Sequence, residues 1–188
     1  MKLDLDFYSR PTVDVARTLL GHVLVRRSPQ GTCAGIIVET EAYTEDDPAC
    51  HANRGKTKRN AMMFARPGLA YVYFIYGMHH CFNIVTAQEG IGEAVLIRAL
   101  APLAGIALMK KRRGHQQLHE LCSGPARLCQ ALAITTEENG VDLLGSEVFL
   151  LAGQTPEKIV TTGRVGISAG QELPYRFYIA DSQFVSRK

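Results

Sequence analysis

Short runs of apolar residues, many of them β-branched or aromatic, recur along the chain and predict strands. These predicted strands lie at 23–26, 36–43, 94–100, 147–151, 159–162, 165–168 and 176–180. Two further runs, 69–76 and 81–86, flank the dipeptide Gly77-Met78. Because a glycine between two such runs is typical of a tight turn, this region is expected to form a β-hairpin.

Helical patterns are fewer than strand patterns. The predicted helices span 11–20, 102–113 and 123–134, and Ser123 is the candidate N-cap of the third. Residues 51–66 form a polar, basic loop. Because no strand–helix–strand alternation occurs, the pattern favours one α+β domain over residues 1–188. We expect a curved, mostly antiparallel sheet or a partly open barrel, flanked by helices, with a protruding hairpin.

The composition of the 188 residues is that of an ordinary globular domain, with 46% hydrophobic and 21% charged residues. No apolar run is long enough for a transmembrane helix, and the first residues lack an apolar signal core. We therefore expect a cytoplasmic protein that does not contact a membrane. The five cysteines include no C-x-x-C pair, which favours buried thiols over disulfides or a metal site. We expect neither a metal nor another cofactor.

Positive charge is concentrated in one part of the sequence. Residues 48–119 contain ten Lys or Arg against two acidic residues, Glu89 and Glu93, although the formal net charge of the chain is only +3. A basic block inside a nearly neutral protein indicates a cationic face for a polyanion such as a nucleic acid. A merely solvated basic surface is the alternative, but the same block is rich in Tyr and His.

The segment 36–43 contains candidate catalytic residues. The two-residue period of a strand places Glu39, Glu41 and Tyr43 on one face. Carboxylates in a confined site are the usual groups for cleaving glycosidic bonds, because a base activates water and an anion stabilises an oxocarbenium-like transition state. The alternative is that both glutamates lie exposed on an edge strand.

Tyrosines cluster around the predicted hairpin. Tyr71 and Tyr73 share one face of the first strand, and Tyr76 falls at the start of the turn. An aromatic ring at a hairpin tip is well placed to insert into a base stack, and rings beside a pocket could hold an extruded base. Core packing is the expectation for Phe74 and Ile75.

Arg98 ends the apolar run 94–97. It is either half-buried against a carboxylate or a donor facing an anion, and the sequence leaves both possibilities open.

Several long segments together resemble one family. They are GIIVETEAY (35–43), RNAMMF (59–64), PGLAYVYFIYGM (67–78), the pair Phe82-Asn83, AVLIRALAPLAG (94–105) and LCSGPARLCQALAI (121–134). In this order they resemble the alkyladenine (3-methyladenine) DNA glycosylase family from about residue 9 to residue 180. The resemblance implies an enzyme that flips a damaged purine out of duplex DNA and hydrolyses its N-glycosidic bond.

The resemblance also implies roles for three catalytic residues. Glu41 corresponds to the general base that deprotonates the attacking water. Arg98 corresponds to an arginine that helps to hold this water. The backbone carbonyl of Val165, in the segment Gly-Arg-Val-Gly, corresponds to a further contact to the water.

A second group of residues is implied to form the base pocket. Tyr43 and Tyr73 correspond to aromatic walls that stack on the flipped base, and His51 corresponds to a residue on its opposite side. Asn83 corresponds to the residue that crowds the 2-amino group of an undamaged guanine. We also assign Leu96, on the strand of Arg98, to this pocket.

A third group of residues is expected to contact DNA. Tyr76 corresponds to the residue inserted through the minor groove into the gap left by flipping, and Met78 beside it contacts neighbouring bases. The expected contacts to the phosphate backbone, from their place in the basic block or at a helix start, are Lys56, Lys58, Arg59, Arg66 and Arg127.

We therefore expect a monofunctional, monomeric DNA glycosylase acting on alkylated or deaminated purines such as 3-methyladenine, 7-methylguanine, hypoxanthine and ethenoadenine. Its partner would be double-stranded DNA containing a damaged base. A lyase activity would require a placed amine nucleophile, and the segment 36–43 has none. The alternatives are a non-catalytic nucleic-acid-binding module, which has no use for Glu41, and a nucleoside hydrolase, which does not need the basic face.

Overall fold

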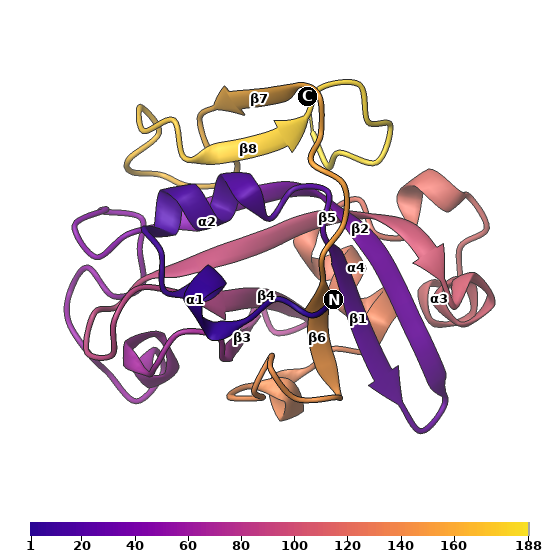
Figure 1. The fold of residues 1–188 in the computed structure, drawn as a ribbon, viewed down its shortest axis with the longest axis horizontal. Helices are drawn as coiled ribbons and strands as arrows, with labels where there is room; N and C mark the ends of the chain where they lie inside the picture. The colour runs from indigo at the N-terminus through magenta and orange to yellow at the C-terminus, as the bar shows by residue number, and fades with distance from the viewer. Residues whose placement is uncertain (188) are drawn as a thin grey trace.

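One antiparallel sheet forms the body of the protein (Figure 1). The structure is a computed structural model that describes residues 1–187. Within these residues the sheet has eight strands, which are β1 (Val23–Ser28), β2 (Gly31–Tyr43), β3 (Ala70–Ile75), β4 (His79–Val85), β5 (Ala94–Ala104), β6 (Val148–Leu151), β7 (Ile159–Thr162) and β8 (Arg176–Ile179). All of their pairings are antiparallel. The predicted α+β fold with a mostly antiparallel sheet is confirmed.

Short helices flank this sheet. The α-helices are α1 (Leu5–Tyr8), α2 (Thr12–Thr18), α3 (Ile106–Arg113) and α4 (Pro125–Leu132), and the 3₁₀ helices are η1 (Ala61–Phe64), η2 (Leu118–Glu120) and η3 (Thr136–Glu138). Among residues 1–187, no helix combines the length and the apolar character needed to cross a membrane. The five cysteines, all within this range, are free and buried, as predicted.

Strand β2 is central to the sheet, whose order is β3-β4-β5-β2-β1-β6. Its first half pairs with β1, almost its whole length pairs with β5, and residues Glu39–Glu41 also pair with β8. Strand β8 in turn pairs with β7, and these two strands lie at one end of the molecule (Figure 1). The part of β2 that contains Glu39 and Glu41 therefore has a strand on each side, so the alternative of an exposed edge strand is wrong.

The pairing of β2 with β5 is irregular near Arg98. Glu39 lies opposite Ala99 and Thr40 lies opposite Ile97, so the register passes over Arg98. Such bulges change the direction of a side chain and are common beside active sites. Arg98 thereby points to the face of β2 that carries Glu39 and Glu41, as its hydrogen bonds show.

The two faces of β2 have different partners. Thr40 points to α2, where its hydroxyl donates to the carbonyl of Ala16 at 2.7 Å. The opposite face of β2 carries Glu41 and Tyr43, and the start of α4 lies on that side. The main hydrophobic core packs between these layers, whereas a smaller core that includes Phe64 and Tyr71 supports the basic loop.

Two predicted helix starts are wrong. Pro102 lies in β5, where it pairs with Gly35, rather than in a helix. Strand β4 pairs with β5 only as far as Leu96, so Pro102 lies beyond this pairing, where its lack of an N–H is tolerated. Helix α3 begins at Ile106, after Gly105 with a φ of 73°. The N-cap of α4 is Gly124 rather than Ser123.

Two further differences from the predictions concern a predicted strand and the first helix. Residues 165–168 form a loop rather than a strand: the N–H of Val165 donates to Glu41 instead of to a neighbouring strand, and the preceding Arg164 pairs with Asp47. The predicted first helix, 11–20, is present as the slightly shorter α2, and the separate α1 before Pro11 was not predicted. The hairpin of β3 and β4 agrees with its prediction to within two residues at each end.

Candidate active site

A cavity of about 470 Å³ lies between the β3–β4 hairpin, β5, the start of α4 and the loop 163–170. It brings together residues that are far apart in the sequence. Those predicted from the sequence to form the site and found in its lining are Tyr43, His51, Tyr73, Tyr76, Asn83, Leu96, Arg98 and Val165. A volume of this size is typical of a site for a small organic group such as a single base.

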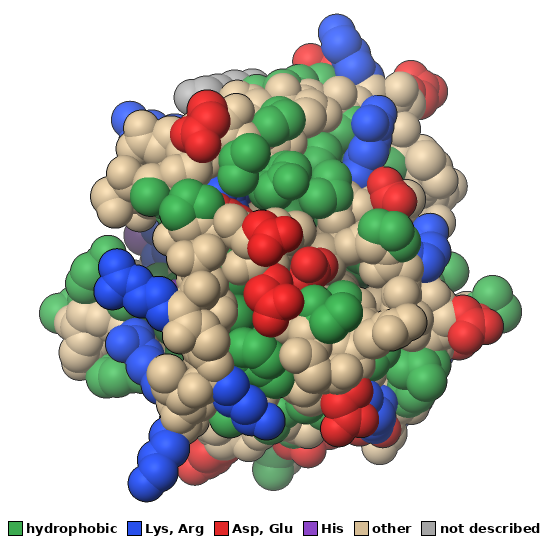
Figure 2. All heavy atoms as spheres, turned by 90° about the vertical axis from the view of Figure 1, so that its left-hand side faces the viewer, with side chains coloured by type: hydrophobic (Ala, Val, Ile, Leu, Met, Phe, Trp, Pro, Cys, Tyr) green, Lys and Arg blue, Asp and Glu red, His purple; other side chains and the backbone are tan. Residues whose placement is uncertain are grey.

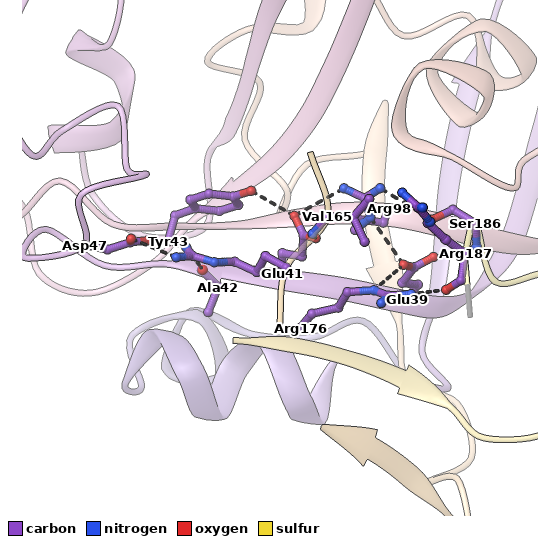
Figure 3. Close-up of polar contacts among 11 residues, drawn as sticks. Glu39, Glu41, Ala42, Tyr43, Asp47, Arg98, Val165, Arg176, Ser186 and Arg187 are labelled. Atoms are coloured by element: carbon purple, nitrogen blue, oxygen red, sulfur yellow. Dashed lines mark hydrogen bonds and ion pairs between the residues drawn. The ribbon is translucent and has the colours of Figure 1, made fainter. Parts of the chain in front are cut away.

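Glu41 lies directly behind the cavity wall and is fully buried. Its Oε1 accepts a hydrogen bond from the backbone N–H of Val165 at 2.8 Å. Its Oε2 accepts from the hydroxyl of Tyr43 at 2.8 Å and from Nη1 of Arg98 at 3.2 Å (Figure 3). The three donors all line the cavity, so they hold the carboxylate at its edge and compensate for its burial.

Arg98 fulfils the first of the two roles that the sequence left open, because it is buried against carboxylates; it also lines the cavity. Its Nε donates to Glu39 at 3.3 Å, while its Nη1 donates to Glu41. Burial by itself lowers the pKa of Arg98, but the carboxylates of Glu41 and Glu39 outweigh this effect and raise the pKa. The guanidinium therefore stays charged beside Glu41.

The loop 163–170 is held by an ion pair that the sequence analysis missed. Arg164 and Asp47 are buried, and Nη2 of Arg164 donates to Oδ1 of Asp47 at 2.8 Å. Arg164 also donates to the carbonyl of Ala42 at 3.0 Å and lies 4.7 Å from the centre of the Tyr43 ring. This anchor places the next residue, Val165, against Glu41. The arginine in Gly-Arg-Val-Gly was the available signal.

Aromatic side chains form one wall of the cavity. The rings of His51 and Tyr73 lie 4.7 Å apart, and those of Tyr71 and Tyr73 lie 5.5 Å apart. Nδ1 of His51 and the hydroxyl of Tyr71 are hydrogen-bonded at 3.0 Å. Burial raises the pKa of Tyr71 to about 12, so this phenol is neutral at pH 7. Burial and the charge of Glu41 likewise raise the pKa of Tyr43, which remains a hydrogen-bond donor.

Asn83 is buried and its side chain is fixed by the hairpin. Its Nδ2 donates to the carbonyl of Tyr71 at 3.0 Å and to that of Cys81 at 3.4 Å. Leu96 lies opposite Asn83 in the pairing of β4 with β5, and both line the cavity. This wall is therefore rigid, because it is set by the sheet and by the Asn83 amide.

The tip of the hairpin exposes large apolar side chains. Tyr76 is 79% exposed with a φ of 54°, and Met78 is 69% exposed. Phe74 is 46% exposed, so its predicted place in the core is wrong; Ile75 is half-buried and lines the cavity. The hairpin extends beyond the layer that would cover its apolar residues. A strained, exposed tyrosine flanked by other apolar side chains indicates a functional surface.

The predicted phosphate contacts have different surroundings. Lys56, Lys58 and Arg59 are exposed on the basic loop. Arg66 pairs with Asp142 at 2.8 Å. Arg127 is exposed, donates to Ser123 Oγ at 3.1 Å and lines a second groove beside Met78.

Charged side chains of each sign form local groups on the surface. Figure 2 shows acidic side chains at the centre of one face and Lys and Arg side chains along its left edge. In the part of the chain that the structure describes, no three His, Cys, Asp or Glu side chains come together as possible metal ligands.

Comparisons with known sequences give the class of this protein as a DNA glycosylase. Residues 6–183 match the family described as "Methylpurine-DNA glycosylase (MPG)". The chain therefore belongs to the methylpurine-DNA glycosylase family. It is a monofunctional glycosylase of base-excision repair, a hydrolase that binds damaged DNA.

Similar chains occur in several other organisms. The chain is 53% identical over 191 residues to a protein of Carboxydothermus hydrogenoformans and 50% identical over 193 residues to one of Methanoculleus marisnigri, with 100% of both chains covered in each case. It is 52% identical to a protein of Rubrobacter xylanophilus over 163 residues, which cover 86% of this chain and 85% of the relative. Each carries the name "Putative 3-methyladenine DNA glycosylase".

The surroundings of His51 predict a shift in its pKa that can be measured. Burial, followed by the positive charge of Arg59, lowers the pKa of His51 below its ordinary value of 6.5. An NMR titration should therefore give His51 a pKa below 6.5, and Arg59→Ala should raise it part of the way back. The spectrum of His51→Gln identifies the resonance. A pKa at or above 6.5, or one that Arg59→Ala does not move, would contradict this account of the cavity rim.

Proposed function

We propose that the protein flips alkylated and deaminated purines out of duplex DNA into the 470 Å³ cavity and removes them with a water activated by Glu41. The carrying observation is the buried carboxylate of Glu41, which Tyr43, Arg98 and Val165 hold at the edge of an aromatic cavity. Such an arrangement suits a reaction that needs a base, a positioned water and a stacking surface.

In the proposed reaction, Glu41 accepts a proton from the water as the water oxygen attacks C1′ of the sugar. The N-glycosidic bond breaks and its electron pair goes to the purine nitrogen, which leaves an abasic site. Arg98 and the backbone of Val165 orient the water. An alkylated purine is already cationic and leaves readily, while the carboxylate stabilises positive charge that develops on the sugar.

The proposed base pocket uses the cavity walls. Tyr43 and Tyr73 stack on the flipped base, and His51 contacts it from the opposite side. Asn83 and Leu96 form the rigid wall, on which Asn83 excludes the 2-amino group of normal guanine. The proposed substrates are 3-methyladenine, which the names of the relatives contain, together with 7-methylguanine, hypoxanthine and ethenoadenine.

The proposed DNA contacts lie around the cavity mouth. Tyr76 fills the gap left by the flipped base, and Met78 contacts the neighbouring bases. Phosphates are bound by Lys56, Lys58, Arg59, Arg66 and Arg127. Because one copy of the chain carries all of these groups, we propose that it acts as a monomer.

The variant Glu41→Gln tests the role of the base. It keeps the shape of the side chain but cannot take up the proton, so the single-turnover rate constant for excision should fall by at least about 10²-fold. Its Kd for lesion-containing duplex should stay within about threefold of the wild type. Glu89→Gln, at an exposed glutamate, serves as the matched control. Excision at the wild-type rate by folded Glu41→Gln would rule out the proposed mechanism.

The variant Tyr76→Ala tests the wedge. It removes the ring that supports the extruded state, so excision should slow most for lesions opposite a good pairing partner and least for mispaired ones, which unstack more easily. Tyr76→Phe should retain most activity, because the flat ring rather than the hydroxyl fills the gap. Rates are measured on one panel of duplexes. Equal losses in every pairing context would argue against a wedge.

A further inference from the structure

Glu39 is the one residue of the predicted catalytic face that the proposed mechanism does not use. It is fully buried and does not line the cavity. Its carboxylate nevertheless accepts three hydrogen bonds, from Nε of Arg98 at 3.3 Å, from Nε of Arg176 at 2.8 Å and from the backbone N–H of Ser186 at 2.7 Å (Figure 3).

These contacts fix Arg98 from behind the cavity. A guanidinium is planar, so a partner that holds its Nε determines the direction of its Nη atoms. Glu39 holds the Nε end, and the Nη1 end reaches Glu41 at 3.2 Å. Ser186 Oγ lies 3.4 Å from Nη2 on the same side. The direction in which Arg98 meets Glu41 therefore depends on groups outside the cavity.

The segment 184–187 encloses this network. Ser186 donates its N–H to Glu39, and the carbonyl of Arg187 accepts a hydrogen bond from Nη2 of Arg176. Arg176 itself lies opposite Glu41 in the pairing of β2 with β8. Two buried carboxylates thus meet two buried guanidiniums. Because buried ion pairs contribute little net stability, a role in geometry accounts better for such a cluster.

We propose that Glu39, fixed by Arg176 and by the backbone of segment 184–187, is a positioning residue that sets Arg98 against Glu41 and the attacking water. This inference rests on the proposed function. It assigns Glu39 no contact with the base or the sugar, because Arg98 transmits its effect.

The first test removes the negative charge of the Glu39 side chain but keeps its shape. Glu39→Gln should lower the single-turnover rate constant for excision by about ten- to hundredfold, as expected when a catalytic group shifts by a fraction of an ångström to one ångström. The Kd for lesion-containing duplex should stay within about twofold, because Glu39 does not line the cavity. Glu138→Gln is the matched control.

Glu138 resembles Glu39 in three respects: it is buried, it pairs with a buried arginine, Arg26, at 2.5 Å, and it does not line the cavity. Its replacement should alter thermal stability in the same way as Glu39→Gln without changing the excision rate of the folded protein. An equal loss of excision in the two variants would show that any buried pair has this effect and would overturn the proposal.

The decisive test is a double-mutant cycle with Arg98→Lys, which keeps the charge but lacks the planar guanidinium that donates through Nε to Glu39 and through Nη1 to Glu41. If Glu39 acts through Arg98, then Glu39→Gln should cause no further loss in the Arg98→Lys background. Independent, multiplying losses would overturn the proposal. Should Glu39→Gln fail to fold, Ser186→Pro removes both contacts of Ser186 with this network, the N–H to Glu39 and the hydroxyl to Arg98. It should slow excision with unchanged Kd; a wild-type rate would overturn the proposal.

Glu41→Gln is measured in the same series to separate two kinds of failure. If Glu41→Gln excises normally, the proposed function fails. If Glu41→Gln is inactive while Glu39→Gln is as fast as the wild type, only the positioning role fails.

Discussion

Two carboxylates are buried side by side on one strand, and the arrangement of the structure around them depends on neutralising their charges. Glu39 and Glu41 are fully buried within β2, where unpaired charges would be prohibitively costly. Arg98 resolves this by contacting both of them, and the bulge that directs its side chain interrupts the pairing of β2 with β5. The strand pairing is thus irregular where the two buried carboxylates require a cation.

Other parts of the fold converge on the same point. Strand β8 brings Arg176 to Glu39, and the ion pair of Arg164 with Asp47 anchors the loop that brings the N–H of Val165 to Glu41. These contacts make the floor of the cavity rigid, while the hairpin at its mouth stays exposed with a strained Tyr76. A preorganised interior with an exposed apolar tip suits an enzyme that must first extract its substrate from a base stack.

Local sequence patterns predicted the structural features that depend only on residues close together in the chain. The two-residue period placed Glu41 and Tyr43 on one face, and they are hydrogen-bonded there. Contacts over long sequence separations have no such signal. The segment Gly-Arg-Val-Gly drew attention to Arg164, but its pairing with Asp47 and the contact of Ser186 with Glu39 could not be predicted. Exposure of Phe74 was missed for a related reason, because local hydrophobicity cannot show that a hairpin extends beyond the core.

We propose that the protein hydrolyses the N-glycosidic bond of a damaged purine held in this cavity. Chromatography of the products tests this proposal after the wild-type protein is incubated with duplex DNA that carries radiolabelled methyl groups on its purines. Free methylated purine should be released, and the strand should stay unbroken until alkali is added. Binding of the alkylated duplex without release of free base, or strand cleavage without alkali, would contradict it.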